Sequence, residues 1–414
     1  MSGPTEIGDL AARRALAIAD HVPGMLVTPD SRAALAASVG EAAARGATIV
    51  PLGLGAHRGI GQAPERYDVA LSTRALARVV DYAPADMTVT VESGVTLAAL
   101  ETLLAAEGQW LPLLAPWPSR TTIGGLVAAD LSGLLRGGQG RVRDYVIGVA
   151  MVTAQGREVR AGGRVVKNVA GYDLMKLMIG SLGTLAVVTE VTMKVRPRPE
   201  TTRVIAFACG EREGGLRLAV HLANLDEVAL AVVLLTGPDH DEPALCCILG
   251  GVAADVTTTR ARVLREMREE ATTLLCDEPA DGAVAGALVA EARDLARAAA
   301  GEIVVRAATL RTRGAALASD LLAELAASSA LFDPRAGVVT VAVVTADPAG
   351  AIARAQAIAA RHEATLTFER WPDALAQTIE VWSPLPASLP LMRRIKEALD
   401  PARTLAPGRF VGRL

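Results

Sequence analysis

The sequence predicts an α+β protein in which a larger N-terminal domain is followed by a second domain beyond a proline-rich boundary. Three observations lead to this expectation. Helical and strand signals alternate along the first 200 residues, Pro197 and Pro199 interrupt the chain, and two βαβ-type halves follow in series. Two such halves predict an antiparallel sheet with helices on one face. With 414 residues, 51% of them hydrophobic, the chain is long enough to form both cores.

The first domain is expected to begin with helices and short strands. Apolar spacing predicts a helix near Glu6–Ala19, and Ser31 caps a second helix that runs to Arg45. Short apolar, strand-like runs predict the strands Thr48–Leu52, Val69–Leu71, Val79–Asp81 and Thr88–Val91. A helix is expected to follow over Thr96–Glu107. The segment Gly108–Gly140 is rich in Pro, Gly and Ser, which predicts a long loop system of the kind that forms a binding site.

A hairpin over Val146–Arg160, turning at Gln155-Gly156, and a strand over Leu185–Val195 close this domain. The second domain is expected to contain strands Val204–Cys209, Glu227–Leu235 and Ala244–Leu249, helices Glu213–Ala223, Val256–Leu275 and Gly282–Ala299, and a strand-helix-strand-helix-strand run over Ile303–Phe368. Helix Leu389–Leu399 and a short tail follow. The expected parts are residues 1–199, with a division near residue 85, residues 200–370 and residues 371–414.

Composition excludes several classes of function. The net charge is −3 and both signs are mixed along the chain, so no basic stripe is present to bind nucleic acid. The four cysteines follow no metal or iron–sulfur spacing, and any iron–sulfur relay must lie on another chain. No apolar run is long enough to cross a bilayer, and the first residues lack the apolar region of a signal peptide. We therefore expect a cytoplasmic protein.

The first candidate site is the segment PLGLGAHRGIG, residues 51–61, which follows a predicted strand. Closely spaced glycines allow successive backbone N–H groups to form a nest that accepts an anionic pyrophosphate. A Rossmann site would need a third glycine that opens a helix, but Arg58 stands at that position and Ala63-Pro64 follows. We therefore expect a loop nest outside the Rossmann class.

Three further segments also contain glycines at turns. Residues 89–100, VTVESGVTLAAL, form an ordinary strand-turn-helix when taken alone. Residues 122–133, TIGGLVAADLSG, combine paired glycines with small neighbours, which would let the backbone lie flat along a planar ligand. Residues 167–195 place a Lys-Asn-x-x-Gly-Tyr-Asp-Leu turn before a Gly-Ser-x-Gly-Thr-Leu turn and a β-rich run. Such segments suit a backbone that approaches a large ligand closely.

The order and spacing of these four segments resemble the FAD-binding domain of the vanillyl-alcohol oxidase/p-cresol methylhydroxylase family. Within it the likeness is strongest to the FAD-binding subunits of glycolate oxidase. The resemblance covers roughly residues 25–200 and returns in the terminal segment Pro407–Phe410. It implies a two-subdomain FAD-binding domain of the p-cresol methylhydroxylase type, a ferredoxin-like cap, and a tail that returns to the first domain.

The resemblance also assigns residues to the cofactor. Those implied to bind FAD are Gly53, Gly55, Ala56 and His57 at the pyrophosphate, Thr122, Gly124, Gly125, Val127, Ala128, Ser132 and Gly133 from there to the isoalloxazine, and Gly183, Thr184 and Val188 near the ribose and adenine. Lys167, Asn168, Tyr172 and Asp173 would shape the wall near the flavin, where Lys167 and Tyr172 are the catalytic candidates. Tyr172 and Asp173 alternatively mark a helix start with a capping carboxylate.

The sequence also departs from the family. Leu52 stands where the pyrophosphate loop commonly carries Arg, Leu182 where the Gly-Ser-Glu-Gly-Thr turn has Glu, and Ala186 where Gly follows. The larger departure concerns relatives that oxidise D-2-hydroxy acids, which hold a divalent metal and position a base with an H-x-G-D-G-N motif and a Glu-His pair. None of the five histidines of this chain lies in such a context.

Two histidines could still carry other chemistry. Some relatives attach the flavin covalently through a histidine near the pyrophosphate loop, but the register of His57 favours non-covalent FAD. His240, in Pro-Asp-His-Asp-Glu, looks like a metal ligand, but consecutive turn residues of this kind are usually solvated, and we expect no metal site.

The expected function is an FAD-binding subunit of a complex that oxidises glycolate or another D-2-hydroxy acid. The expected partners are a catalytic flavoprotein sister subunit and an iron–sulfur subunit, with this chain accessory or electron-transferring and attachment to the inner face of the membrane only through partners. One alternative is a stand-alone FAD-dependent dehydrogenase that uses Arg306, Arg311 or Arg313, and another is a flavin-free assembly subunit. Whether Trp371 and Trp382 face the flavin or a partner is left open.

Overall fold

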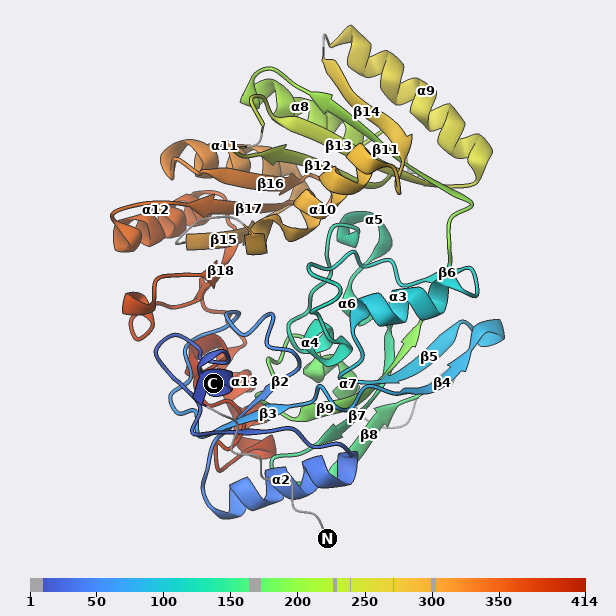
Figure 1. The fold of residues 1–414 in the computed structure, drawn as a ribbon. Coiled ribbons are helices and arrows are strands. Elements are labelled where there is room, and N and C mark those ends of the chain that lie inside the picture. The colour runs from blue at the N-terminus through green and yellow to red at the C-terminus, as the bar shows by residue number, and fades with distance from the viewer. Residues whose placement is uncertain (1–9, 164–172, 226–228, 239, 271, 299–302) are drawn as a thin grey trace.

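The structure is a computed structural model, and it describes residues 10–163, 173–225, 229–238, 240–270, 272–298 and 303–414. These residues form sheets of three, five and nine strands and one two-stranded pair. The nine-stranded sheet and its helices lie at one end of the molecule, and the two smaller sheets lie at the other end (Figure 1). The expected α+β class is confirmed.

The three-stranded sheet is parallel, in the order β1 (Met25–Val27), β3 (Val69–Ser72) and β2 (Ile49–Leu52). Helix α2 (Arg32–Ala44) begins where the sequence predicts, because the Ser31 Oγ accepts a hydrogen bond of 3.2 Å from the Ala34 N–H. It buries Leu35 and Val39 against this sheet. Helix α1 (Leu10–Arg14) ends before the predicted limit at Ala19.

The five-stranded sheet is antiparallel, in the order β4 (Val79–Ala83), β5 (Thr88–Glu92), β9 (Val187–Lys194), β7 (Val146–Val152) and β8 (Glu158–Gly162). The predicted hairpin is confirmed, since β7 and β8 join through a turn in which Gly156 has a φ of +74°. Helix α3 (Leu97–Ala105), capped by Thr96 as expected, and helix α4 (Ile123–Ala128) share one core with this sheet. The short elements η1 (Pro84–Asp86), α6 (Val142–Tyr145) and α7 (Leu174–Met178) lie at its ends.

The nine-stranded sheet is antiparallel throughout, as expected. Its order is β14 (Thr273–Pro279), β11 (Thr201–Ala208), β13 (Ala244–Gly251), β12 (Ala229–Thr236), β16 (Ser329–Asp333), β17 (Val338–Val343), β15 (Ile303–Ala308), β18 (Thr365–Arg370) and β19 (Trp382–Ser383). The short helices η2 (Arg311–Arg313) and η3 (Asp373–Leu375) lie in its connections.

Strand β14 corrects the predicted helix Val256–Leu275. Helix α9 (Ala253–Glu269) ends at Glu269, and the chain then pairs with β11 as an edge strand. The apolar run Leu274-Leu275-Cys276 is compatible with both a helix and a strand, so periodicity alone could not separate them. Pairing with β11 decides the outcome, and it buries Cys276 beside Ala206.

Four helices cover one face of the nine-stranded sheet, which confirms that part of the prediction. They are α8 (Arg212–Ala223), α9, α11 (Gly314–Glu324) and α12 (Pro348–Arg361). Helix α10 (Ala283–Ala298) instead packs on the opposite face, which is turned toward the rest of the molecule (Figure 1). Leu134 and Leu135, from the segment after α4, join the same apolar cluster. The two parts of the chain therefore share a core at this face.

Strand pairing and helix packing also connect the two ends of the molecule. Strand β6 (Gln109–Trp110) pairs with β10 (Arg196–Pro197), so the proline-rich boundary itself forms a strand. Helix α5 (Arg136–Gln139) packs on β12, and Arg335 donates to the carbonyl of Ala229 beside it. The division into parts at residues 199 and 370 stays a prediction. Strand β19, which lies beyond residue 370, pairs with β18 and so belongs to the large sheet.

The C-terminal segment returns to the three-stranded sheet. After helix α13 (Leu389–Leu399) the chain runs beside β2, where Ile49 N–H donates to Thr404 and Ala406 N–H donates to Ile49, both at 2.7 Å. Trp382 packs edge-to-face on Phe410, with ring centroids 5.6 Å apart, ahead of the final turn η4 (Val411–Arg413).

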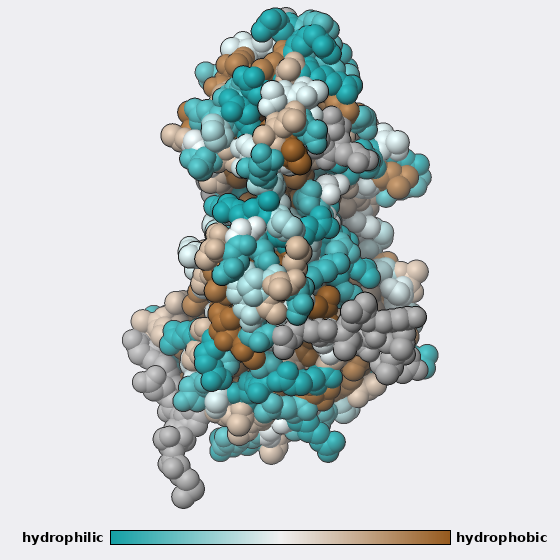
Figure 2. Space-filling model, turned by 90° about the vertical axis from the view of Figure 1, so that its right-hand side faces the viewer, coloured by the Kyte–Doolittle hydropathy of each residue, from teal (hydrophilic) through white to brown (hydrophobic). Residues whose placement is uncertain are grey.

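Across the described ranges, every helix is too short or too polar to cross a bilayer. On the face in Figure 2, apolar residues form small separate groups among hydrophilic ones.

Candidate functional site

The loop after β2 contains backbone N–H groups that have no acceptor among the described residues. Residues 53–60 form bends and turns, and Gly55 has a φ of +73°, which favours glycine. Within the described ranges, the N–H groups of Gly53, Leu54, Gly55 and Ala56 donate to no protein acceptor. Consecutive N–H groups without protein acceptors are what an anion-binding nest requires.

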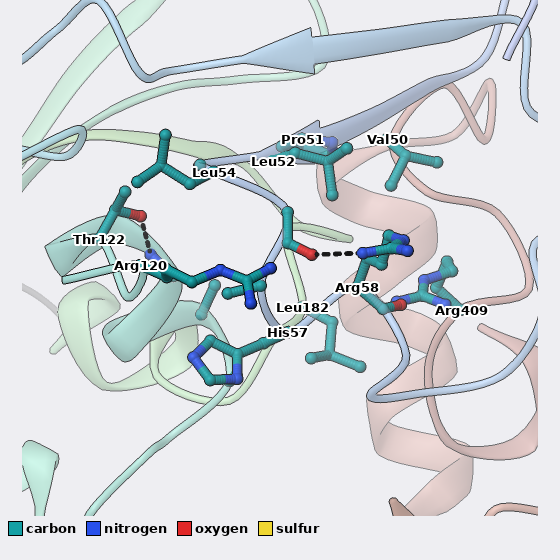
Figure 3. A pocket seen from close by; sticks show the side chains of 16 residues that line it. Val50, Pro51, Leu52, Leu54, His57, Arg58, Arg120, Thr122, Leu182 and Arg409 are labelled. Carbon is teal, nitrogen blue, oxygen red and sulfur yellow. Dashed lines mark hydrogen bonds between the residues drawn. The ribbon is translucent and has the colours of Figure 1, made fainter. Parts of the chain in front are cut away.

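Two adjoining hollows lie along this loop. We call the first the loop hollow; its lining includes residues 50–58, Arg120, Thr122, Gly125, Ala128, Ala129, Leu182 and Arg409 (Figure 3). We call the second the turn hollow; its lining includes Thr73, Gly124, Ser181, Gly183 and residues 186–188. Gly53, Gly125 and Ala128 line both, so the two hollows form one continuous surface.

Helix α4 supplies a flat wall between the two hollows. Thr122 caps it by accepting a 3.1 Å hydrogen bond from the Gly125 N–H. The N–H groups of Ile123 and Gly124 are also satisfied, because they donate to Val95 and Ser93 at 2.8 Å. The expected loop over residues 123–128 is therefore wrong. This segment is the start of a helix, and its first backbone N–H groups donate to acceptors within the protein. Its wall can lie against a planar group without supplying hydrogen bonds.

Close contacts explain the glycines at this wall. A Cβ on Gly53 would lie 2.1 Å from the Thr122 Oγ1, and one on Gly124 would lie 2.8 Å from the Ser93 Cβ. Gly183 has a φ of +72°, and a Cβ there would lie 3.0 Å from the ring of Pro51. These positions let the loop, the helix start and the 181–184 turn pack together.

His57 is held at the edge of the loop hollow. Its Nε2 lies 2.6 Å from the Thr121 hydroxyl, and that hydroxyl donates its proton to the Pro116 carbonyl at 2.6 Å. The hydroxyl therefore accepts from His57, which places a proton on Nε2. The imidazole also stacks on Trp117, with ring centroids 6.0 Å apart.

A third hollow lies between the first part of the chain and the nine-stranded sheet, and we call it the sheet-side hollow. Ala129 lines both this hollow and the loop hollow. The lining includes residues 129–134, Ile60, Arg136, Arg293, Arg306, Asp333, Thr340, Thr367 and Glu369. Most of the charged side chains come from the nine-stranded sheet, α5 and α10, whereas Asp130, Ser132 and Gly133 come from the segment after α4.

The arginines of this hollow differ in their partners. Arg306 donates from Nε to Glu369 at 2.9 Å, and Arg293 pairs with Asp294 at 2.9 Å. Arg136 has neither a hydrogen bond nor an ion pair with any described side chain, and burial lowers its pKa to about 10. Arg136 is therefore the guanidinium that can bind an anion without breaking an existing pair.

Asp333, like Asp130, is an acidic residue of this hollow whose charge acts on Arg136. Its Oδ1 accepts from the N–H groups of Arg335 and Ala336, both at 3.0 Å. Burial raises the pKa of Asp333 to about 6, although those N–H groups and the charge of Arg136 act in the other direction. A carboxyl group with such a pKa can exchange a proton near neutral pH.

The predicted cofactor residues occupy three kinds of position. Ten of them line the loop and turn hollows: Gly53, Gly55, Ala56, His57, Thr122, Gly124, Gly125, Ala128, Gly183 and Val188. Ser132 and Gly133 line the sheet-side hollow. Val127 lies in the interior, and Thr184 is buried with its hydroxyl donating to Ser181, so both have packing roles.

The other candidates lie elsewhere. Lys167, Asn168 and Tyr172 lie outside the described residues. Asp173 stands before α7, but its side chain makes no capping bond. Arg311 donates to Asn224 and Arg313 pairs with Glu363, so of the three proposed substrate arginines only Arg306 lines the sheet-side hollow. His240 pairs with Glu291 at 2.8 Å.

Sequence reasoning missed Arg120, Arg136, Asp333 and Arg409 as site residues. Arg409 is only 4% exposed, and its guanidinium donates to the carbonyls of Arg58, Ile60 and Gln62. Burial lowers the pKa of Arg409 to about 10. Its place in the terminal Pro-Gly-Arg-Phe segment was the only available signal. Each of the four lies far along the chain from the glycine loop.

Comparison with known protein families identifies a domain in the part of the chain that contains the glycine loop. Residues 23–162 match the family profile described as an FAD binding domain. This confirms the expected domain and its cofactor, FAD.

Several curated relatives match part of the chain. Glycolate oxidase subunit GlcE of Escherichia coli (strain K12) is 38% identical over 191 residues, which are 46% of this chain and 53% of that protein. Glycolate oxidase subunit GlcD of Bacillus subtilis (strain 168) is 33% identical over 275 residues, 64% of this chain and 56% of that protein. D-lactate dehydrogenase of Archaeoglobus fulgidus is 32% identical over 166 residues, 40% of this chain and 37% of that protein. The chain spans about half the length of the first two relatives.

Solved structures match the fold over nearly the whole chain. p-Cresol methylhydroxylase with substrate bound has a TM-score of 0.74 at 16% identity, and the match covers 97% of this chain and 92% of that one. Alkyldihydroxyacetonephosphate synthase has a TM-score of 0.67 at 18% identity, covering 93% and 76%. The expected p-cresol methylhydroxylase type of fold is confirmed.

Proposed function

We propose that the chain is the FAD-binding subunit of a complex that oxidises glycolate or a related D-2-hydroxy acid, because residues 23–162 match the profile of an FAD binding domain. The observation that carries the proposal is the continuous hollow along the glycine loop, next to the sheet-side hollow, in which Arg136 pairs with no described side chain. Relatives named as glycolate oxidase subunits and as D-lactate dehydrogenase support this substrate class.

The residues of the loop and turn hollows fit FAD. The N–H groups of residues 53–56 have no acceptor among the described residues and can bind the pyrophosphate. A Cβ on Gly125 would meet only the Thr122 Oγ1 within 4 Å, so side chains at this wall would project into the hollow. The turn with Gly183 and the side chain of Val188 would hold the adenosine end. FAD is non-covalent in this proposal, as the register of His57 in the sequence favours, and His57 Nε2 instead holds the Thr121 hydroxyl.

Bound FAD would accept a hydride from the α-carbon of the substrate. The residues of this chain would hold the cofactor and exclude water along α4. They would orient the isoalloxazine end toward Ser132 and Gly133 in the sheet-side hollow. Electrons would leave through an iron–sulfur partner subunit, in a complex located in the cytoplasm. The sequence lacks the H-x-G-D-G-N motif of catalytic relatives, which favours a sister flavoprotein subunit as the main site of oxidation.

The absorbance spectrum of the chain expressed alone tests this proposal. We expect a flavin spectrum that stays oxidised when glycolate is added without oxygen. Bleaching of the flavin would assign oxidation to this chain itself. Failure to bind added FAD would instead support the flavin-free assembly subunit.

A second candidate, oxidation by this chain, is favoured by the sheet-side hollow. Arg136 would bind the substrate carboxylate, and Asp333 would take the hydroxyl proton. In that case Arg136→Gln should raise KM for glycolate, and Asp333→Asn should lower kcat, with FAD affinity unchanged in both. Arg311→Gln is the matched control, because Arg311 lies outside the hollow and donates to Asn224. Equal kinetics for all variants would contradict this candidate.

A further inference from the structure

The loop hollow contains three arginines, and two of them are already used by the protein. Arg58 donates from Nε to Ala17 at 3.0 Å and from Nη1 to Gly55 at 3.1 Å. Arg409 donates to three loop carbonyls. Both guanidinium groups are tied to backbone carbonyls, Arg58 through two of its five N–H donors and Arg409 through three.

Arg120 is different. Its guanidinium forms no hydrogen bond or ion pair with any residue that the structure describes. Figure 3 shows its side chain reaching into the loop hollow, between Leu54 and His57. The group therefore carries a positive charge next to the N–H groups of residues 53–56 without a carboxylate that neutralises it.

A rigid platform holds Arg120 in this place. Its guanidinium carbon lies 5.2 Å from the centroid of the Trp117 ring, whose other neighbour is the imidazole of His57. The backbone of Trp117 is fixed on both sides. Its backbone N–H donates to the Asp294 carboxylate at 3.0 Å, and its carbonyl oxygen accepts from the backbone N–H groups of Arg120 and Thr121 at 2.8 Å. The turn leads directly into the cap of α4, so Arg120 stands at the opening of the hollow.

The charge of the hollow makes this position important. The pyrophosphate of FAD is dianionic, and the residue after Pro51, at the end of β2, is the apolar Leu52. The start of α4 adds no donors, since its N–H groups are used within the protein. Among the arginines that line the hollow, Arg120 is thus the one whose guanidinium forms no hydrogen bond with a described residue, so all its donors are available to a phosphate.

We propose that Arg120 binds the pyrophosphate of FAD from the open side of the loop and determines the preference of this chain for phosphate-bearing flavins. The proposal rests on FAD binding by the 23–162 domain and goes beyond it by naming the residue that supplies the charge. Because Arg120 is exposed, its contribution depends on ionic strength.

Affinities for FAD and riboflavin, measured by flavin fluorescence on the purified chain, test the proposal. We expect Arg120→Gln to weaken FAD binding about tenfold and to leave riboflavin binding unchanged, since riboflavin has no phosphate. Arg120→Lys should recover part of the loss. Arg157→Gln is the matched control, because Arg157 is exposed on the β7–β8 turn outside the hollow.

A salt titration gives a second readout that needs no riboflavin binding. The FAD dissociation constant of the unmodified chain should rise with salt more steeply than that of Arg120→Gln. Equal FAD affinity and equal salt dependence in the two proteins would overturn the proposal, as would an equal loss of affinity for both flavins. A chain that binds no FAD before any substitution would instead contradict the cofactor assignment.

Discussion

Lys396 donates a hydrogen bond of 2.7 Å to the carbonyl oxygen of Thr184, which joins the C-terminal helix to the turn beside the turn hollow. The same ammonium group pairs with Asp400 at 2.6 Å and donates to Leu405 at 2.9 Å. Asp400 is fully buried and accepts from the N–H groups of Thr404 and Leu405. One buried ion pair thus fixes α13, the tail and the 181–184 turn together.

We expect Lys396→Met to lower the free energy of unfolding by about 3–5 kcal/mol, because it leaves the Asp400 carboxylate buried without a cation. Urea unfolding measures the change. Lys194→Met, at an exposed position, should have little effect. The double variant Lys396→Met, Asp400→Asn should recover part of the loss, since it removes the unpaired charge; no recovery would indicate that the carbonyl contacts dominate.

Arg409 should affect both stability and cofactor binding. Arg409→Lys cannot reproduce the three hydrogen bonds to Arg58, Ile60 and Gln62, and we expect a loss of about 2–4 kcal/mol in the free energy of unfolding. FAD affinity should fall as well, because those carbonyls belong to the loop that follows the nest. Arg143→Lys, at an exposed position, is the control. Arg120→Gln should differ by leaving stability unchanged, and an unaltered unfolding curve for Arg409→Lys would contradict the structure.

Asp333 should make stability fall as the pH rises. Its pKa is raised from 3.8 to about 6 in the folded chain, so between these values the folded state binds the proton more tightly than the unfolded state. The contribution is fully present below pH 3.8 and is lost as the pH rises through about 6, with a maximum of roughly 3 kcal/mol. Relative to Asp333→Asn, the unmodified chain should therefore lose stability between pH 4 and 6. A constant difference between the two unfolding curves would show that the carboxyl group is ionised throughout.

Local signals predicted many of the elements. Ser31 and Thr96 cap their helices as expected, and the β7–β8 hairpin turns at Gly156. These features depend on residues within a few positions of one another, so a single sequence contains the information. Strand β14 was missed because its apolar run fits two periodicities, and pairing with β11, more than 60 residues earlier, selects the strand.

The candidate site was predictable only in part. Glycines mark the loop because close packing excludes a Cβ, as at Gly53 against Thr122. The arginines carry no such mark. Arg120 matters because the chain folds it against Trp117 beside a loop 60 residues earlier, and Arg136 meets Asp333 only when the two parts of the chain come together. Arginines are frequent on surfaces, so neither spacing nor composition could identify these.

The contact between Gly53 and Thr122 gives a direct test of the packing between the loop and α4. A Cβ at residue 53 would lie 2.1 Å from the Thr122 Oγ1 and 2.8 Å from its methyl group, so Gly53→Ala must displace the cap of α4. Because the same cap borders both hollows, we expect FAD affinity to fall at least tenfold and stability to fall by about 1–3 kcal/mol. Gly214→Ala is the matched control, since its nearest neighbour would lie at 3.7 Å and its position in α8 favours alanine. The double variant Gly53→Ala, Thr122→Ser removes the methyl group but keeps the capping oxygen, and the 2.1 Å contact is with that oxygen. It should therefore recover little, whereas full recovery would show that the methyl group alone opposes the side chain.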